Sequence, residues 1–173
     1  MVQPAAKANA QIPTFKTLGA DLALTRYSGV ASSVPLEFAD SWGTLDLQVV
    51  PGGRGGLPAT GASQDLSAVA GRENLAQALI LRLLTQQGAL APLGHPEYGS
   101  RLVELIGQLN NETTRNQARL YTVEAVTREK RVRKLLDLAV DTPDGQPDTI
   151  RISFSVLPLD DDQPLSLALE INL

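Results

Sequence analysis

Four glutamates are the residues of this chain best suited to acid–base chemistry: Glu73, Glu97, Glu104 and Glu112. Hydrolysis of a glycosidic bond uses two carboxyl groups about 5–10 Å apart across a cleft, one of them with a raised pKa. The sequence marks no such pair, and Glu104 and Glu112 fit solvated positions on a helix or a loop. Sugar-binding clefts also tend to carry aromatic platforms, whereas Trp42 is the only tryptophan. We therefore expect no catalytic residues and no enzyme, with a muramidase-like glycosidase as the alternative.

The other residue types that bind ligands are scarce. Cysteine is absent and His95 is the only histidine, which excludes thiolate and histidine-rich metal sites. His95 lies among turn-forming residues, where a hydrogen-bonded loop role is far commoner than a catalytic one. The glycine-rich stretch 51–63 lacks the lysine and hydroxyl residue of a phosphate-binding loop, so it is read as a linker. We expect no metal site and no cofactor.

The overall charge limits the partners. The chain has 173 residues, a net charge of −4 and 43% hydrophobic residues, enough for one domain with a core. Nucleic-acid binding normally requires a basic face, which this acidic chain does not predict. The first residues lack the apolar run of a signal peptide, and no stretch is long enough to span a bilayer. We expect synthesis in the cytoplasm, with no nucleic-acid or membrane partner.

Hydrophobic periodicity predicts three helices. The first covers about residues 73–87, the second about residues 100–109, and the third runs from Asn111 or Thr113 to about Arg128. The first is marked by leucines at every fourth position: Leu75, Leu79 and Leu83. Such a stripe is suited to burial against a sheet.

After Glu129 the hydrophobic period changes to two. Residues 132–141, 150–156 and 165–173 alternate apolar and polar side chains, with turn signals between them. In the first stretch the alternation places five residues on one face: Val132, Lys134, Leu136, Leu138 and Val140. The pattern predicts an α+β fold, in which helices pack on one face of a small antiparallel sheet formed by a C-terminal three-stranded meander.

The N-terminal third is organised differently. Weak alternation around Leu22 and from Leu45 to Val49 suggests short strands, followed by the glycine-rich linker. We predict an extended N-terminal region over residues 1–64 and a compact domain over residues 65–173.

Four segments of the compact domain resemble a known family. They are R-E-N-L-A-Q-A-L-I-L-R-L-L-T (residues 72–85), G-H-P-E-Y-G-S (94–100), N-N-E-T-T-R-N-Q-A-R-L-Y (110–121) and T-R-E-K-R-V (127–132). Their order resembles the lysozyme-like baseplate wedge family, the sheath initiators of contractile phage tails, type VI secretion systems and extracellular contractile injection systems. The resemblance covers roughly residues 65–173.

The resemblance implies two partner-binding regions. Where the family has Glu-Pro-Arg at the end of a helix, this chain has Glu129, Lys130 and Arg131. In the family this corner contacts the helical core bundle of the wedge. The family's last three strands resemble the strand-exchange domain of the sheath protein. By that likeness, four residues of the last strand would take part in pairing with a sheath strand: Leu165, Leu167, Leu169 and Ile171.

The resemblance also implies the role of the whole protein. It would be a structural baseplate component that joins the wedge core bundle to the first sheath ring and templates sheath assembly. Its partners would be the sheath protein, other wedge proteins and the tube or spike hub, with six copies in each baseplate. It would reside in the baseplate of a phage tail or released particle, which the residues fit at least as well as a type VI apparatus. A generic interaction module outside any such machine is a third reading.

Overall fold

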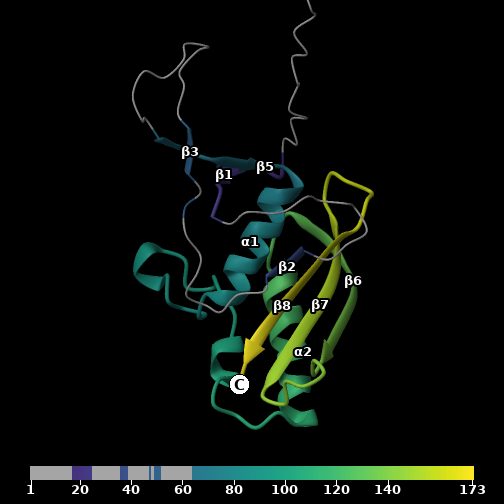
Figure 1. The fold of residues 1–173 in the computed structure, drawn as a ribbon. Coiled ribbons are helices and arrows are strands. Elements are labelled where there is room, and N and C mark those ends of the chain that lie inside the picture. Colours follow the sequence, from purple (N-terminus) through teal and green to yellow (C-terminus); the bar gives the residue numbers. More distant parts are fainter. Residues whose placement is uncertain (1–16, 25–35, 39–46, 48, 52–63) are drawn as a thin grey trace, which may run out of the picture.

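The centre of the fold is a meander of three antiparallel strands. The computed structural model describes residues 17–24, 36–38, 47, 49–51 and 64–173. The meander comprises β6 (Val132–Asp141), β7 (Thr149–Pro158) and β8 (Leu165–Asn172). Helices α1 (Arg72–Leu84) and α2 (Glu112–Thr127) cover one face of it (Figure 1). The predicted α+β class and the C-terminal meander are confirmed.

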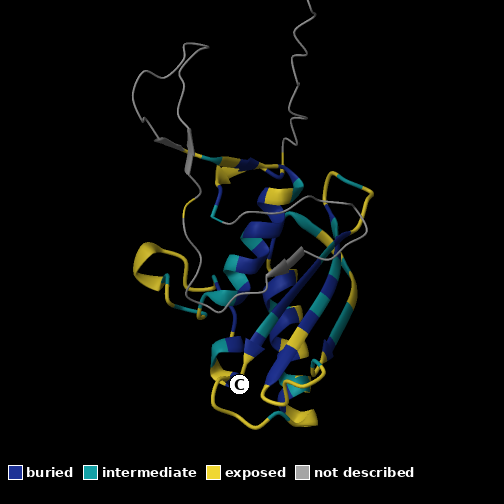
Figure 2. Cartoon of the chain, in the orientation of Figure 1, coloured by how far each residue is buried: buried dark blue, intermediate teal, exposed yellow. Residues whose placement is uncertain are grey.

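The inner face of the meander is the core of the molecule. Strands β7 and β8 pair without a register break from Thr149–Asn172 to Val156–Leu165. Because side chains alternate between the two faces of a strand, this register puts every second residue against the helices. These buried residues are Ile150, Ile152, Phe154 and Val156 of β7 and Leu165, Leu167, Leu169 and Ile171 of β8 (Figure 2).

A fourth strand joins the sheet beside β8. Strand β2 (Leu36–Phe38) runs parallel to β8, with Leu36 opposite Leu167 and Phe38 opposite Leu169. The order of the sheet is therefore β2-β8-β7-β6, and β8 is an interior strand over this three-residue stretch. The sequence did not predict this strand, because three residues are too few to show a period.

Strand β6 departs from the strict alternation that its sequence predicted. Its register against β7 shifts between Val132 and Lys134 and again between Leu135 and Asp137, which leaves Arg133 and Leu136 as extra residues. Each extra residue reverses the faces that follow it. As a result, Leu135 and Leu138 pack against the core, whereas Leu136 is 44% exposed. The predicted placement of Lys134 and Leu136 on the apolar face was wrong.

The two helices begin and end close to the predicted residues. The leucine stripe of α1 is fully buried, and the helix ends at Thr85, whose backbone is extended. Helix α2 is capped by Asn111, whose side-chain oxygen accepts a hydrogen bond of 2.9 Å from the backbone N–H of Thr114. This is the usual way to satisfy an unpaired donor in the first turn of a helix.

The predicted helix over residues 100–109 is not an α-helix. Only a 3₁₀ turn, η2 (Leu102–Leu105), forms there, and the backbone of Ile106 is already extended. Gly107 then takes a positive φ of 86°, which α-helical geometry does not allow. The turn still buries Leu102 and Leu105, so the apolar spacing that suggested a helix reflects packing of a shorter element.

Two short antiparallel pairs of strands lie near the start of α1 (Figure 1). Strand β1 (Ala20–Leu22) pairs with β5 (Ala68–Ala70), and β3 (Val49–Pro51) pairs with β4 (Gln64–Leu66). Strand β1 confirms the strand signal around Leu22.

The structure describes only part of the other segments predicted for the N-terminal region. Most of the predicted 45–49 strand and linker residues 52–63 lie outside the described residues. Leu18 is fully buried in the core formed with residues of the compact domain. The division at residue 64 stays a prediction.

The loop from Thr85 to Ser100 projects from the end of α1 and is closed at its base. Ser100 donates its N–H to the carbonyl of Thr85 at 2.8 Å, and Gln87 donates to the carbonyl of Ser100 at the same distance. Gly99 sits inside this closure with φ of 104°, where an added Cβ would lie 2.6 Å from the carbonyl oxygen of Thr85. Both the positive φ and the lack of room for a Cβ therefore require glycine at position 99.

We expect Gly99→Ala to lower the free energy of unfolding by about 3 kcal/mol, because left-handed strain and a backbone clash add. Gly94→Ala is the matched control, since Gly94 has φ of 86° but nothing within 4 Å of its added Cβ. The control should lose only about 1–2 kcal/mol. Urea denaturation of both variants measures the difference, and equal losses would contradict the close approach.

Candidate functional site

The corner between α2 and β6 is organised around the carboxylate of Glu129. This side chain is only 8% exposed and lies between two guanidinium groups. It accepts a hydrogen bond of 3.1 Å from Nη2 of Arg82 on α1 and one of 2.8 Å from Nε of Arg131. The carboxylate therefore links α1 to the α2–β6 corner.

Arg82 is held on two sides. Its guanidinium carbon lies 4.6 Å from the centre of the Tyr98 ring, in the projecting loop, and its Nη2 contacts Glu129. Its Nε is buried without an acceptor among the described residues. Two guanidinium groups thus face one carboxylate, and the cluster of Arg82, Glu129 and Arg131 carries excess positive charge.

The pKa of Glu129 reflects this arrangement. Burial acts to raise it, but the hydrogen bonds and positive charge of Arg131, together with Arg82, outweigh burial and hold the pKa below its ordinary value of 4.5. The group is therefore ionised at neutral pH, and the ion pairs are present throughout the physiological range.

The same corner fixes the start of the described N-terminal segment. Nη1 of Arg131 donates to the carbonyl of Leu18 at 3.2 Å, and Nδ2 of Asn74 donates to the same oxygen at 2.7 Å. One turn along α1, the Gln77 side chain donates to the carbonyl of Leu22 and accepts from the N–H of Leu24. Asn74 and Gln77 are buried, so these amides depend on the segment for their hydrogen bonds.

The three residues of the predicted wedge-contact triplet differ in burial. Glu129 is buried and Arg131 is half-buried, and both make contacts within the chain, whereas Lys130 is exposed. The structure brings Glu129 and Arg131 together, and adds Arg82, Tyr98 and Leu18, which sequence reasoning missed. Their contribution could not be read from the sequence because they lie 30 or more residues from the triplet. The contact with the wedge bundle stays a prediction.

The predicted sheath-pairing residues lie on the buried face of β8. Leu165, Leu167, Leu169 and Ile171 are each 3% exposed or less, so their side chains serve the core. Pairing with another chain through β8 would have to use main-chain groups at its outer edge.

The register shows which main-chain groups those are. Leu173 donates its N–H to the carbonyl of Asp148 at 2.8 Å, one step beyond the pair Thr149–Asn172. Hydrogen-bonded and non-bonded pairs alternate in an antiparallel ladder. Counting back from Leu173, which follows β8, the main-chain N–H and C=O groups of every second residue therefore point to β7. The N–H and C=O groups of the others point to the outer edge: Ser166, Ala168, Glu170 and Asn172.

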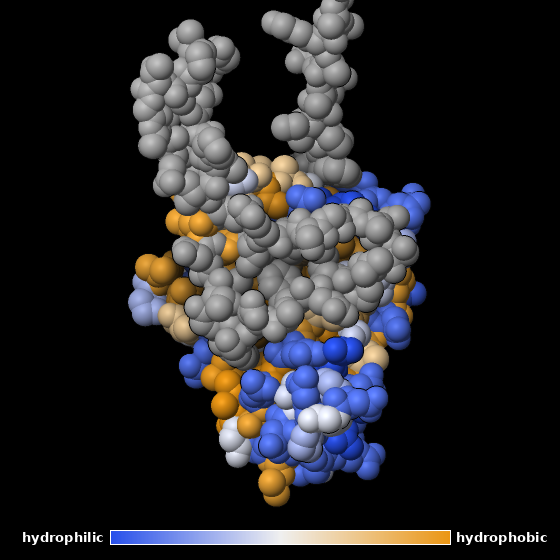
Figure 3. All heavy atoms as spheres, viewed as in Figure 1, coloured by the Kyte–Doolittle hydropathy of each residue, from blue (hydrophilic) through white to orange (hydrophobic). Residues whose placement is uncertain are grey.

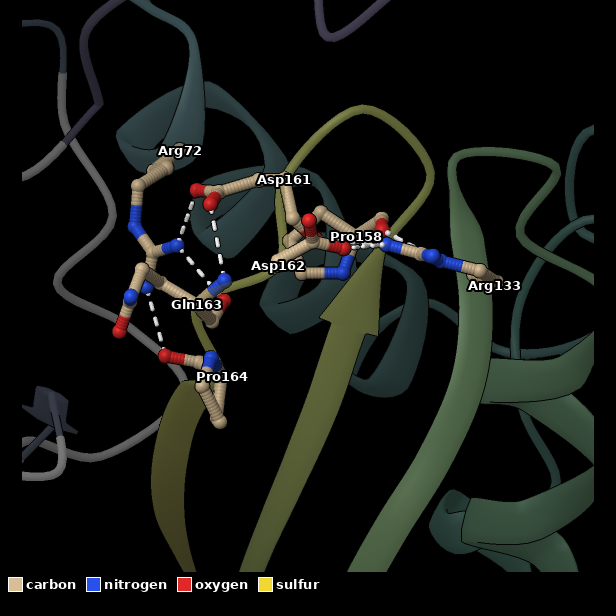
Figure 4. Close-up of polar contacts among 7 residues, drawn as sticks. All are labelled: Arg72, Arg133, Pro158, Asp161, Asp162, Gln163 and Pro164. Atoms are coloured by element: carbon tan, nitrogen blue, oxygen red, sulfur yellow. Dashed lines mark hydrogen bonds and ion pairs between the residues drawn. The ribbon is translucent and has the colours of Figure 1, made fainter.

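Two arginines hold the loop that leads into β8 (Figure 4). Arg72, at the start of α1, forms an ion pair with Asp161 and donates to the carbonyls of Gln163 and Pro164 at 2.8 and 2.6 Å. Arg133 of β6 donates to the carbonyl of Asp161 and to the carboxylate of Asp162. The first residue of β8 is therefore positioned by α1 and β6 together. The sequence showed only an aspartate-rich turn here.

The four candidate acids lie on the surface of the molecule. Glu73, Glu97, Glu104 and Glu112 are all exposed. Glu104 forms an ion pair of 2.8 Å with Arg101, whose hydrogen bond holds the pKa of that carboxyl below its ordinary value. A glycosidase acid requires the opposite shift.

Other site types find no support among the described residues. No group of three or more histidine, cysteine, aspartate or glutamate side chains within them could hold a metal ion. In the same part of the chain, no helix has the length and apolar character to cross a membrane. The end of the molecule with the β6–β7 turn and the start of α2 is mainly hydrophilic on the face shown in Figure 3.

Comparison with known proteins adds a likeness of fold. No family model matches the chain, and no curated protein matches it. Among solved structures, the 1.44 Å crystal structure of a Geobacter sulfurreducens protein provisionally named a tail lysozyme is similar, with a TM-score of 0.50. The match covers 58% of this chain and 89% of that chain, at 19% sequence identity. At this identity the likeness establishes a shared fold.

The Glu129 cluster generates a pH-dependent prediction. We expect Glu129→Gln to lower the free energy of unfolding by about 3 kcal/mol at pH 7, because it leaves two buried or half-buried guanidinium groups without their anion. A carboxyl with a lowered pKa stabilises the fold above its unfolded value and loses that effect as pH falls through its folded pKa. The difference between the two proteins should therefore shrink below about pH 4.5. Urea denaturation from pH 7 to pH 3 measures it.

Glu104→Gln is the control, because Glu104 also pairs with an arginine and also has a lowered pKa, but lies on the surface. Its effect should be much smaller at every pH. Equal effects of the two substitutions would show that the corner is an ordinary surface ion pair.

Proposed function

We propose that this protein is a structural baseplate component of a contractile, phage-tail-like injection machine. It joins the core bundle of the baseplate wedge to the first ring of the sheath, and it templates sheath assembly by strand pairing. It performs no reaction and needs no cofactor. Three features support this: the family-like triplet at the α2–β6 corner, the C-terminal meander, and a fold shared with a protein named for a phage tail.

The outer edge of β8 is the observation that carries the proposal. Strand β8 keeps an unbroken register with β7 over eight residue pairs, and the Arg72 and Arg133 contacts fix the loop before it. Its inward side chains are buried in the core, which fixes the position of its main chain. A regular edge of this kind is what β-augmentation by an incoming strand requires.

The α2–β6 corner is the proposed contact with the wedge bundle. Lys130 is exposed and Arg131 is partly so, beside a cluster with excess positive charge. This chemistry suits an acidic segment of a partner. Lys130 stands where the family has proline, so this chain adds a cation at the corner.

The proposed assembly follows from these two contacts. Six copies would surround the tube, each bound to wedge proteins through its corner and to a sheath subunit through β8, near the tube or spike hub. The protein would be assembled in the cytoplasm and would remain in the baseplate of a phage tail or a released particle.

Ser166→Pro tests the role of the β8 edge. Proline removes a backbone N–H that points to the outer edge, so the pairing with β7 keeps its hydrogen bonds. We expect particles that contain the variant in their baseplates but carry no sheath, as seen by electron microscopy. Ser166→Ala is the matched control, because it loses the same hydroxyl contact to Ser155 but keeps the N–H. It should assemble normal sheaths.

The folding of Ser166→Pro must be shown by circular dichroism and by thermal unfolding beside the alanine variant. Sheaths of normal length on folded Ser166→Pro protein would refute strand pairing through this edge.

A muramidase is the second candidate, because the solved structure with a similar fold is provisionally named a tail lysozyme. The exposed acids and the lowered pKa of Glu104 disfavour it. We expect purified protein to release no reducing sugar from peptidoglycan, with hen-type lysozyme activity as the positive control. Release that is abolished by Glu104→Gln would reverse this choice.

A further inference from the structure

The two outer strands of the three-stranded meander, β6 and β8, differ in how well they could accept another strand. Strand β6 contains two extra residues, Arg133 and Leu136, which break its register, and it carries charges at Lys134 and Asp137. Bulges and charges are the devices by which proteins protect a sheet edge from pairing. Strand β8 has an unbroken register, and Glu170 is its only charged residue. The β8 edge is therefore the one suited to pairing.

That edge is occupied by a short strand of the same chain. Among the residues that the structure describes, β2 pairs with Leu167–Leu169, three of the eight residues in β8, and it comes from the region upstream of the compact domain (Figure 1). Ala168, whose main-chain groups point to this edge, lies opposite Glu37. In a parallel ladder, such a residue forms hydrogen bonds with the two neighbours of the residue opposite it. The N–H of Ala168 therefore points to the carbonyl of Leu36, and the C=O of Ala168 points to the N–H of Phe38.

We propose that β2 is an intramolecular occupant of the strand-acceptor site on β8, and that an incoming strand of another chain takes its place. The orientation of β2 indicates what kind of strand would replace it. That strand is an extended segment that runs parallel to β8, with a carbonyl facing the N–H of Ala168 and an N–H facing the C=O of Ala168. A longer strand makes more main-chain bonds along β8 than the three residues of β2, so it displaces β2. Until then, β2 covers the edge and prevents premature pairing. That the incoming strand belongs to a sheath subunit rests on the proposed function.

Hydrogen exchange in the full chain tests this occupancy residue by residue. Phe38→Pro removes the β2 donor that faces the C=O of Ala168, and Phe38→Ala is the matched control that keeps it. We expect the Ala168 amide to exchange about ten-fold or more faster in the proline variant than in the alanine variant. The Leu169 amide faces β7 and serves as an internal reference, which should change little.

A synthetic peptide with the sequence of residues 34–40, V-P-L-E-F-A-D, then supplies the strand in trans. At about 1 mM it should restore slow exchange at Ala168 in Phe38→Pro. It should leave the original chain unchanged, because the covalently attached β2 has the higher effective concentration.

Three outcomes would overturn the inference. One is unchanged exchange at Ala168 in Phe38→Pro, which would mean that β2 does not hold this edge. Another is equal acceleration at Ala168 and Leu169, which would make β2 a general support of the sheet. The third is failure of the peptide to restore protection. None of these measurements involves sheath protein, so this inference can fail while the Ser166→Pro result still supports sheath pairing, and the reverse.

Discussion

The buried carboxylate of Glu129 is the interaction on which the relative positions of the elements depend. It joins α1 to the α2–β6 corner through Arg82 and Arg131, and Arg131 extends the network to the carbonyl of Leu18. A buried charge is costly unless it is paired and hydrogen-bonded, so these elements can pack only in the arrangement that supplies both guanidinium groups. The segment at Leu18, the two helices and the start of β6 thus meet at the Glu129 carboxylate and its arginine partners.

The corner lies beside the loop that leads into β8, at the same end of the sheet, because Leu159 donates its N–H to the carbonyl of Arg131 at 2.9 Å and Val132 pairs with Pro158. The same α1 that carries Arg82 begins at Arg72, which holds the loop before β8, while β6, which begins just after Arg131, carries Arg133 to the same loop. The corner and the loop before β8 are thus connected by α1, which carries Arg82 and Arg72, and by the start of β6, where Arg133 lies two residues after Arg131.

Periodicity predicted what depends on repeated burial, and it failed where single residues decide. The leucines of α1 and the alternation in β7 and β8 gave the right elements, because each is supported by several buried positions. The extra residues Arg133 and Leu136 could not be foreseen, since a bulge changes the register without changing composition. Strand β2 and the contact of Arg82 with Glu129 depend on long-range pairing, which a single sequence does not show. The family-like triplet did mark the corner, but gave neither the burial of Glu129 nor its partners.

The described part of the N-terminal region buries the side chain of Leu18 in the core, and its hydrogen bonds to the compact domain are made through its main chain. Asn74, Gln77 and Arg131 bind carbonyls and an N–H of residues 18–24, and β8 pairs with the backbone of residues 36–38. Main-chain recognition depends on extension and direction, and little on side-chain identity. A strand from another protein can therefore satisfy the β8 edge without resembling β2 in sequence. In the proposed exchange, β2 and a partner strand would use the same main-chain groups of β8, and the number of main-chain bonds that each forms would decide between them.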